Sequence, residues 1–165
     1  PGWAQENPVP SDLYSYFSES NATSSLKLNG ENIEFKMNKG YAVLARKWHS
    51  GDVIELDLPM PIRFVQAHEN VDADFGKVSM ERGPIVYCAE AVDNYGKVLN
   101  LAVDPKSEFQ ADYKEHLLNG LVAITGTSRR MDQNGKKQDF RAVPYYAWGH
   151  RQSGEMAVWL PVWSQ

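Results

Sequence analysis

Residues 25–35 have the sequence SLKLNGENIEF, in which two short runs of alternating polarity flank an asparagine and a glycine. The runs are Ser25-Leu26-Lys27-Leu28 and Ile33-Glu34-Phe35, and such alternation is typical of half-buried strands. Asn29 and Gly30 accept the positive φ angles of a tight hairpin turn. The stretch therefore predicts two paired strands.

A second strand signal lies at residues 53–58, with the sequence VIELDL. Ile54, Leu56 and Leu58 share one face of an extended chain, and the acidic residues between them share the other. A period of two with an acidic outer face predicts a strand whose apolar face is buried.

Pro59-Met60-Pro61 removes two backbone donors and restricts φ, so regular pairing should stop there. We take this run as a boundary between two lobes. Further runs bounded by Gly, Pro, Asp or Asn predict strands at 62–67, 76–80, 83–89, 97–103, 142–148 and 155–163. Many short strands with turn signals at close intervals predict an all-β fold of the β-sandwich or jelly-roll type, with little helix.

Composition and charge exclude several partners. The chain has 165 residues, of which 42% are hydrophobic and 23% charged, so it can bury a core. Its net charge of -4 gives no basic field for nucleic acid. The short basic run at 128–130, with Lys136 and Lys137, is interpreted as a solvated hairpin. No segment approaches the length of an apolar membrane span. We therefore expect no nucleic acid and no membrane as partners.

The ends and the single cysteine give further expectations. Pro1-Gly2-Trp3-Ala4 has no basic stretch followed by an apolar run, so no secretory signal is expected, and we expect the chain to start inside a longer protein. Cys88 is the only cysteine, which excludes an internal disulfide and a multi-cysteine metal site.

Several phrases, in order over nearly the whole chain, resemble the C-terminal part of glycoside hydrolase family 127, the β-L-arabinofuranosidase-like family. They are PGWA at 1–4, GYAV at 40–43 before the Trp48 turn, GDVIELDLPM at 51–60, GKV at 76–78, RGPIVYC at 82–88, PYYAW at 144–148 and MAVWL at 156–160. The joint order makes the resemblance specific for this family.

The resemblance implies a nested layout, because in this family a helical (α/α)6 barrel precedes two β-sandwiches, one inserted in the other. Residues 1–60 with 144–165 would form the first sandwich, which would lack its upstream strands, and residues 61–143 the inserted second. It also implies a soluble bacterial protein of carbohydrate metabolism. The compartment stays open between cytoplasm, periplasm and secretion.

The family's chemistry resembles that of a retaining glycosidase with a zinc-bound cysteine nucleophile, whose ligands lie in the barrel. None of those motifs occurs here, and Cys88 is interpreted as a small buried thiol. His68, Asp72 and Asp74 match no zinc or calcium pattern. Glu81 and Glu90 are interpreted as solvent-facing. We therefore expect no catalytic residue, no metal site and no cofactor in this chain, and place the zinc in the missing barrel.

Tyr146, Trp148 and His150 are the candidate carbohydrate-binding residues. If residues 144–150 form a strand, the three side chains project from one face, with Tyr145 and Ala147 on the other. Exposed aromatic rings there could stack against a sugar. The alternative is that these rings form sandwich core or dock against the missing barrel.

Two functions stay open. The first is a non-catalytic β-sandwich module that supports or docks on the parent's own catalytic barrel, which would hydrolyse arabinofuranosides or related glycans. The alternative is an independent carbohydrate-binding module with a glycan as partner; autonomous catalysis has no candidate residues. We also predict an apolar patch or open strand edge near residues 1–28, which could form a homodimer.

Overall fold

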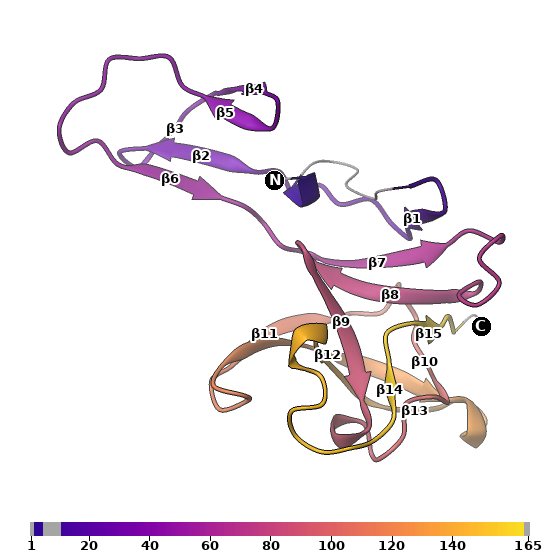
Figure 1. The fold of residues 1–165 in the computed structure, drawn as a ribbon. Helices are drawn as coiled ribbons and strands as arrows, with labels where there is room; N and C mark the ends of the chain where they lie inside the picture. Colours follow the sequence, from indigo (N-terminus) through magenta and orange to yellow (C-terminus); the bar gives the residue numbers. More distant parts are fainter. Residues whose placement is uncertain (1, 5–10, 164–165) are drawn as a thin grey trace. The chain divides into compact units, whose positions relative to one another are not determined.

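The computed structural model describes residues 2–4 and 11–163. Within these residues the elements are fifteen short β-strands and four 3₁₀ helices of three residues each, so the all-β prediction is confirmed (Figure 1). None of the helices in this part of the chain has the length and apolar character that crossing a membrane requires. The chain divides into two compact units, Pro1–Pro8 with Ser20–Pro61 and Val9–Glu19 with Ile62–Gln165.

The first unit contains a three-stranded antiparallel sheet in the order β3-β2-β6 and a separate hairpin of β4 and β5. The element bounds are η1 (Gly2–Ala4), β2 (Ser25–Leu28), β3 (Glu31–Asn32), β4 (Lys36–Asn38), β5 (Tyr41–Val43) and β6 (Ile54–Asp57).

The hairpin predicted at residues 25–35 is present, but its second strand lies at Glu31–Asn32 and not at residues 33–35. Leu28 pairs with Glu31, so Asn29 and Gly30 form a two-residue turn with φ angles of 52° and 85°. Positive φ at both positions matches the right-handed twist of the flanking strands. The Asn29 side chain also accepts the backbone N–H of Val53 at 2.8 Å. The turn is thereby tied to the start of β6.

The strand predicted at residues 53–58 is present as β6, but its apolar face is open. Leu56 lies opposite Leu26 and Ile54 lies opposite Leu28 in the antiparallel register, so the four side chains share one face. Leu26 and Leu28 are buried, whereas Ile54 and Leu56 are 41% and 54% exposed. The face is therefore covered on the middle strand β2 and open on the edge strand β6.

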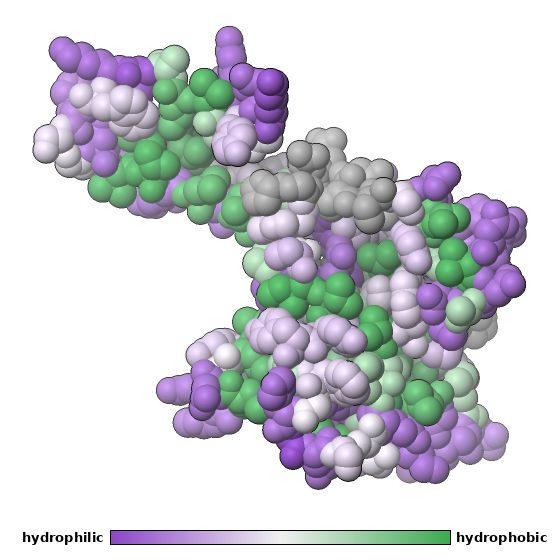
Figure 2. Space-filling model, viewed as in Figure 1, coloured by the Kyte–Doolittle hydropathy of each residue, from purple (hydrophilic) through white to green (hydrophobic). Residues whose placement is uncertain are grey.

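This open face lies outside residues 1–28, which were expected to carry an apolar patch or an open strand edge. Within that range Leu26 and Leu28 are buried and Leu13 is 41% exposed, while β1 (Tyr14–Tyr16) pairs among the described strands on one side only, with β7 (Ile62–Ala67). Residues 1 and 5–10 of the range lie outside the described residues. Apolar surface is visible among hydrophilic residues on the first unit in Figure 2. The exposed large apolar side chains of this unit are Met37, Tyr41, Val43, Trp48, Val53, Ile54 and Leu56.

The second unit is built on one antiparallel sheet in the order β1-β7-β8-β9-β13-β12-β10, with β11 on β12, β14 on β9 and β15 on β8. Its strands are β1 (Tyr14–Tyr16), β7 (Ile62–Ala67), β8 (Lys77–Arg82), β9 (Ile85–Glu90), β10 (Leu101–Ala102), β11 (Gln110–Lys114), β12 (Leu121–Arg130), β13 (Lys136–Pro144), β14 (Met156–Ala157) and β15 (Leu160–Pro161). The single-turn helices are η2 (Ala91–Asp93), η3 (Met131–Gln133) and η4 (Tyr145–Ala147).

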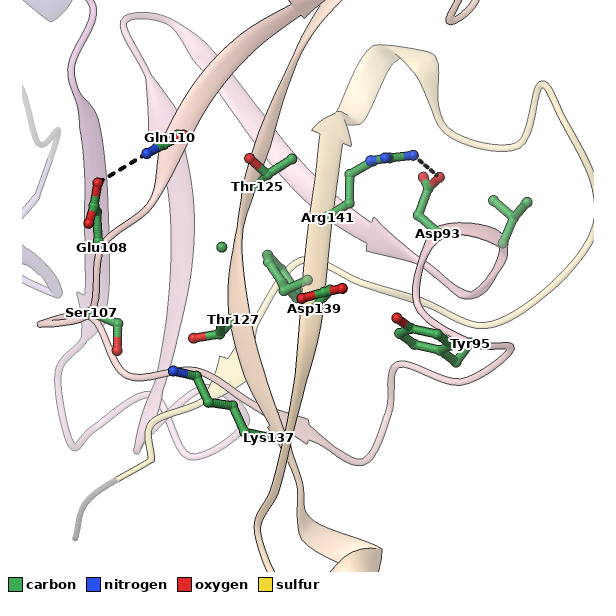
Figure 3. A pocket seen from close by; sticks show the side chains of 13 residues that line it. Asp93, Tyr95, Ser107, Glu108, Gln110, Thr125, Thr127, Lys137, Asp139 and Arg141 are labelled. Carbon is green, nitrogen blue, oxygen red and sulfur yellow. Dashed lines mark hydrogen bonds and ion pairs between the residues drawn. The ribbon is translucent and has the colours of Figure 1, made fainter.

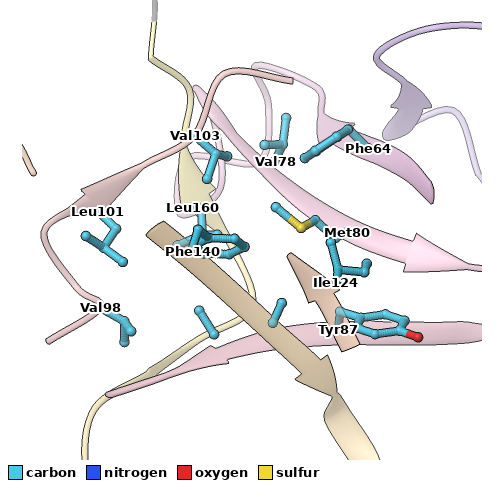
Figure 4. Close-up of a cluster of buried hydrophobic side chains, with 12 residues drawn as sticks. Phe64, Val78, Met80, Tyr87, Val98, Leu101, Val103, Ile124, Phe140 and Leu160 are labelled. Atoms are coloured by element: carbon cyan, nitrogen blue, oxygen red, sulfur yellow. The ribbon is translucent and has the colours of Figure 1, made fainter. Parts of the chain in front are cut away.

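The sheet of the second unit curls back on itself. Val103, just after β10, donates its N–H to the Pro161 carbonyl at 2.9 Å, and Trp163 donates to the Val103 carbonyl at 2.8 Å. Since β15 pairs with β8, these bonds join the β10 edge to the middle of the sheet. The curl encloses one apolar core (Figure 4), formed by Phe64, Val78, Met80, Tyr87, Ala89, Val98, Leu101, Val103, Ile124, Phe140, Ala142 and Leu160.

The structure corrects where the end of the chain belongs. Residues 144–165 were expected to return to the first sandwich, but β14 pairs with β9 and β15 pairs with β8 inside the second unit. The physical reason is Leu160, which is 3% exposed and completes the core of that unit. Residues 14–16 also join it, because β1 pairs with β7. Residues 164 and 165 of the expected range lie outside the described part.

Candidate functional site

The three candidate residues lie in an exposed turn, residues 145–150, which we call the aromatic turn. The predicted strand ends at Pro144, and the helix η4 follows, with the Trp148 N–H donating to the Tyr145 carbonyl at 3.1 Å. Tyr146, Trp148 and His150 are all exposed, but they do not form one strand face. The strand ends where η4 begins, and Ala147 in this helix packs in an apolar cluster.

The turn brings Trp148 together with Tyr145 rather than with Tyr146 or His150. The Tyr145 and Trp148 rings stack with their centroids 6.0 Å apart and an interplanar angle of 18°. Both rings are nearly half exposed. The turn thus presents a flat aromatic surface to solvent, and such a surface suits contact with either a sugar ring or another protein surface.

A buried ion network holds the aromatic turn in place. Glu90, at the end of β9, is 3% exposed, and its Oε1 accepts the backbone N–H of Gly149 at 3.0 Å. Arg151 Nη2 donates to Glu90 Oε2 at 2.5 Å, and Arg151 Nη1 donates to Asp93 Oδ1 at 2.9 Å. Hydrogen bonds to Asp93 and Glu90 raise the pKa of Arg151 above its ordinary value. Arg151 therefore pairs with both carboxylates, Arg141 adds a second positive charge beside Asp93, and the residues just after the turn are fixed.

The interpretation of Glu90 as solvent-facing is wrong, and the network was missed. Its partner Arg151 is 61 residues away in the sequence, so no local pattern connects them. The one sequence signal was that Glu90 ends the strand phrase IVYCAE, in which neighbouring positions are apolar. Glu90 and Asp93 are both paired with Arg151, which indicates that these two carboxylates have a structural role.

Cys88 is buried, as predicted. It is 1% exposed in the cluster that also contains Leu121, Ala123 and Val143. Burial, with a contribution from the nearby Glu90 carboxylate, raises the pKa of the thiol to about 12. The side chain is covered by apolar neighbours, so this cysteine has the surroundings of a structural thiol and not those of a reactive one. Within residues 2–4 and 11–163, no three His, Cys, Asp or Glu side chains are grouped to hold a metal ion.

The native Cys88 thiol is expected to resist a disulfide reagent at pH 8. With a pKa of about 12, roughly one thiol in ten thousand is ionised at that pH, and the side chain is covered as well. The absorbance of released thiol reporter should show one equivalent only after denaturant is added. Rapid stoichiometric labelling of the folded chain would contradict this burial.

Comparisons with known proteins identify the family. Residues 62–161 match the model of the glycoside hydrolase family 127 C-terminal domain, and residues 1–60 match that of the β-L-arabinofuranosidase GH127 middle domain. The chain belongs to glycoside hydrolase family 127. Within this family it therefore corresponds to the middle and C-terminal domains.

Relatives of known name or structure are much longer than this chain. A non-reducing end β-L-arabinofuranosidase of Bifidobacterium longum subsp. longum is 33% identical, in an alignment that covers 84% of this chain and 24% of the relative. A solved GH127 β-arabinofuranosidase has a TM-score of 0.86 at 41% identity, over 98% of this chain and 26% of its own. A solved GH127 β-L-arabinofuranosidase from Geobacillus stearothermophilus T6 has a TM-score of 0.78 at 35% identity, over 92% of this chain and 27% of its own. This chain spans about a quarter of their length.

Proposed function

We propose that this chain is the non-catalytic β-sandwich part of a longer family 127 glycoside hydrolase, and that it supports a catalytic barrel acting on arabinofuranosides or related glycans. The observation that carries the proposal is the open apolar face of β6, formed by Ile54 and Leu56. The lengths and names of the relatives support it, as does the burial of Cys88.

The partner that covers this face is the catalytic part of the same parent protein. About three quarters of each relative lies outside the region that this chain matches, which leaves ample protein to cover it. Covering the exposed halves of Ile54 and Leu56 would contribute about 1 kcal/mol each. In the described sheet, β6 pairs on one side only, with β2, so its outer edge is also free to pair with a further strand.

The test is to produce the chain and the catalytic part of the parent as separate polypeptides and to measure their association by sedimentation. Leu56→Glu should weaken association at least tenfold, because it places a charge in the covered face. Glu55→Gln is the matched control, because Glu55 lies on the opposite face of β6 and should leave association unchanged. Equal binding by both variants would contradict the proposal, as would self-association of the chain in place of binding to the barrel.

A second candidate function, binding of a glycan by the chain alone, is favoured by the stacked rings of the aromatic turn. In this proposal Trp148 supplies the stacking ring, and Tyr146 and His150 add contacts beside it. The turn is exposed and held by Glu90, so it is pre-organised for a ligand. Loss of oligosaccharide binding in Trp148→Ala, with the fold retained, is the expected result. Unchanged binding in that variant would exclude the turn.

A further inference from the structure

A polar groove lies along β12 and β13 in the second unit (Figure 3). It consists of a pocket of about 810 Å³ and an adjoining one of about 650 Å³, which share Tyr95, Lys137 and Asp139. The groove is separate from the aromatic turn, whose residues line neither pocket. It belongs to the second unit and the apolar face of β6 to the first, so a ligand in the groove does not depend on the docking function.

The floor of the groove is set by strand register. Thr125 pairs with Arg141 and Thr127 pairs with Asp139, so these four side chains form two cross-strand pairs on one face of the sheet (Figure 3). Phe140, between the two β13 residues, points the other way into the core. The floor therefore offers hydroxyl, guanidinium and carboxylate groups side by side.

One wall is Tyr95, which is 69% exposed and whose backbone is held in an unusual conformation. Its φ of 56° is left-handed, which is rare for a bulky residue and needs support from its surroundings. That support comes from Asn94, which is fully buried. Asn94 Nδ2 donates to the carbonyls of Glu90 and Arg141 at 2.8 and 2.9 Å, and its Oδ1 accepts the Arg141 N–H at 3.1 Å. The adjacent buried anchor thus fixes the backbone that carries Tyr95 at the groove.

The opposite wall is fixed by Phe109. Its ring passes over Gly126, where a Cβ would lie only 2.4 Å from Phe109 Cδ1. The missing side chain therefore admits the ring, which packs edge-on against Phe140 with the centroids 6.1 Å apart. Glu108 and Gln110, on either side of Phe109, line the groove, and Gln110 Nε2 donates to Glu108 Oε1 at 3.0 Å (Figure 3). The packing of Phe109 therefore supports this wall in the absence of a ligand.

The second pocket is positively charged. Lys97, Lys136 and Lys137 line it, all three are exposed, and none forms an ion pair within the part of the chain that the structure describes. Arg130, also in this pocket, is neutralised by Asp132 at 2.8 Å. Three ammonium groups are thus exposed to an anion in this pocket. The Asp139 carboxylate also lines it, and the carboxylates of Asp132 and Glu155 lie near Lys97, so Lys136 and Lys137 are the lysines most available to the anion.

We propose that this groove binds an acidic oligosaccharide. One sugar ring would stack on Tyr95, and its hydroxyls would bond to the threonine, glutamine and carboxylate groups of the first pocket. A carboxylate on a neighbouring sugar would lie among the three lysines of the second pocket, where a charge-assisted hydrogen bond is stronger than a neutral one. Tyr95 lines both pockets, so a single chain of sugars can make both contacts.

The experiment is calorimetric titration of the 165-residue chain with a galacturonic acid trisaccharide and with a neutral arabinose trisaccharide at low salt. The acidic ligand should bind at least tenfold more tightly, and added salt should reduce this preference. Tyr95→Ala should weaken binding of the acidic ligand about tenfold or more, because the ring is lost. The double variant Lys136→Gln with Lys137→Gln should remove the preference without abolishing binding.

Phe75→Ala is the matched control, since it removes an exposed aromatic ring of the same unit outside the groove, and it should bind the acidic ligand as the original chain does. Loss of binding in Trp148→Ala with retention in Tyr95→Ala would move the sugar to the aromatic turn and overturn the groove proposal. Equal affinity for the two trisaccharides, or no binding at millimolar concentrations, would also overturn it. None of these results depends on whether the chain docks on a barrel.

Discussion

Replacing Arg151 with alanine is expected to lower the free energy of unfolding by about 3–5 kcal/mol. Arg151 neutralises Glu90, which is 3% exposed, and also bonds to Asp93. Without the guanidinium, two carboxylates stay inside the unit with their charge uncompensated, apart from the more exposed Arg141 that also contacts Asp93. The cost arises from the unpaired charges, since an intact buried pair adds little net stability.

Urea unfolding monitored by tryptophan fluorescence measures this effect. Lys106→Ala is the control, because it removes a positive charge from an exposed site in the same unit and should change stability by less than about 0.5 kcal/mol. The double variant Arg151→Ala with Glu90→Gln should recover part of the loss, because one of the stranded charges is gone. Equal stability of Arg151→Ala and Lys106→Ala would show that the network carries no structural role.

Phe140→Ala is expected to cost about 3–5 kcal/mol, because it removes a large side chain from the centre of the curled sheet. Phe140 is 2% exposed and packs edge-on against Phe109, whose ring packs in turn against Phe64. The cavity would also loosen Phe109 and with it one wall of the groove. Sugar binding should therefore weaken together with stability.

Phe75→Ala is the matched control, since this phenylalanine of the same unit is 61% exposed. Its loss should change the free energy of unfolding by less than about 0.5 kcal/mol. Thermal and urea unfolding of both variants would check the difference. A Phe140→Ala variant as stable as Phe75→Ala would mean that the core does not centre on Phe140.

Turns and single strands could be predicted from the sequence where a few neighbouring residues determine them. The Asn29-Gly30 turn requires positive φ at two adjacent residues, and this requirement is visible in the residue types alone. The period of two at Ile54 and Leu56 predicted the strand and the face correctly. It could not predict that this face is exposed. The alternation shows which side chains are apolar, but it does not show whether the segment that packs on them belongs to the same chain.

Long-range placement could not be predicted from such signals. The phrase at residues 156–160 has strand character, but only the pairing of β14 with β9 and β15 with β8 assigns it to the second unit. The aromatic turn was predicted as a strand because Tyr and Trp favour strands, whereas the chain forms the helix η4 directly after Pro144. The groove was missed because its floor is formed by two strands, and the sequence does not show their register. Polar residues do alternate at 125 and 127 and at 137, 139 and 141, which was the sequence signal for a polar sheet face.

We expect the catalytic part of the parent protein to cover the open apolar face of β6. Hydroxyl-radical footprinting of Ile54 and Leu56, in this chain alone and in the full-length parent, tests this docking most directly. The buried Leu26 on the same face serves as the internal reference and should stay protected in both proteins. Oxidation of Ile54 and Leu56 should fall at least severalfold in the parent, because the catalytic part shields both side chains. Equal oxidation of both residues in the two proteins would contradict the docking function.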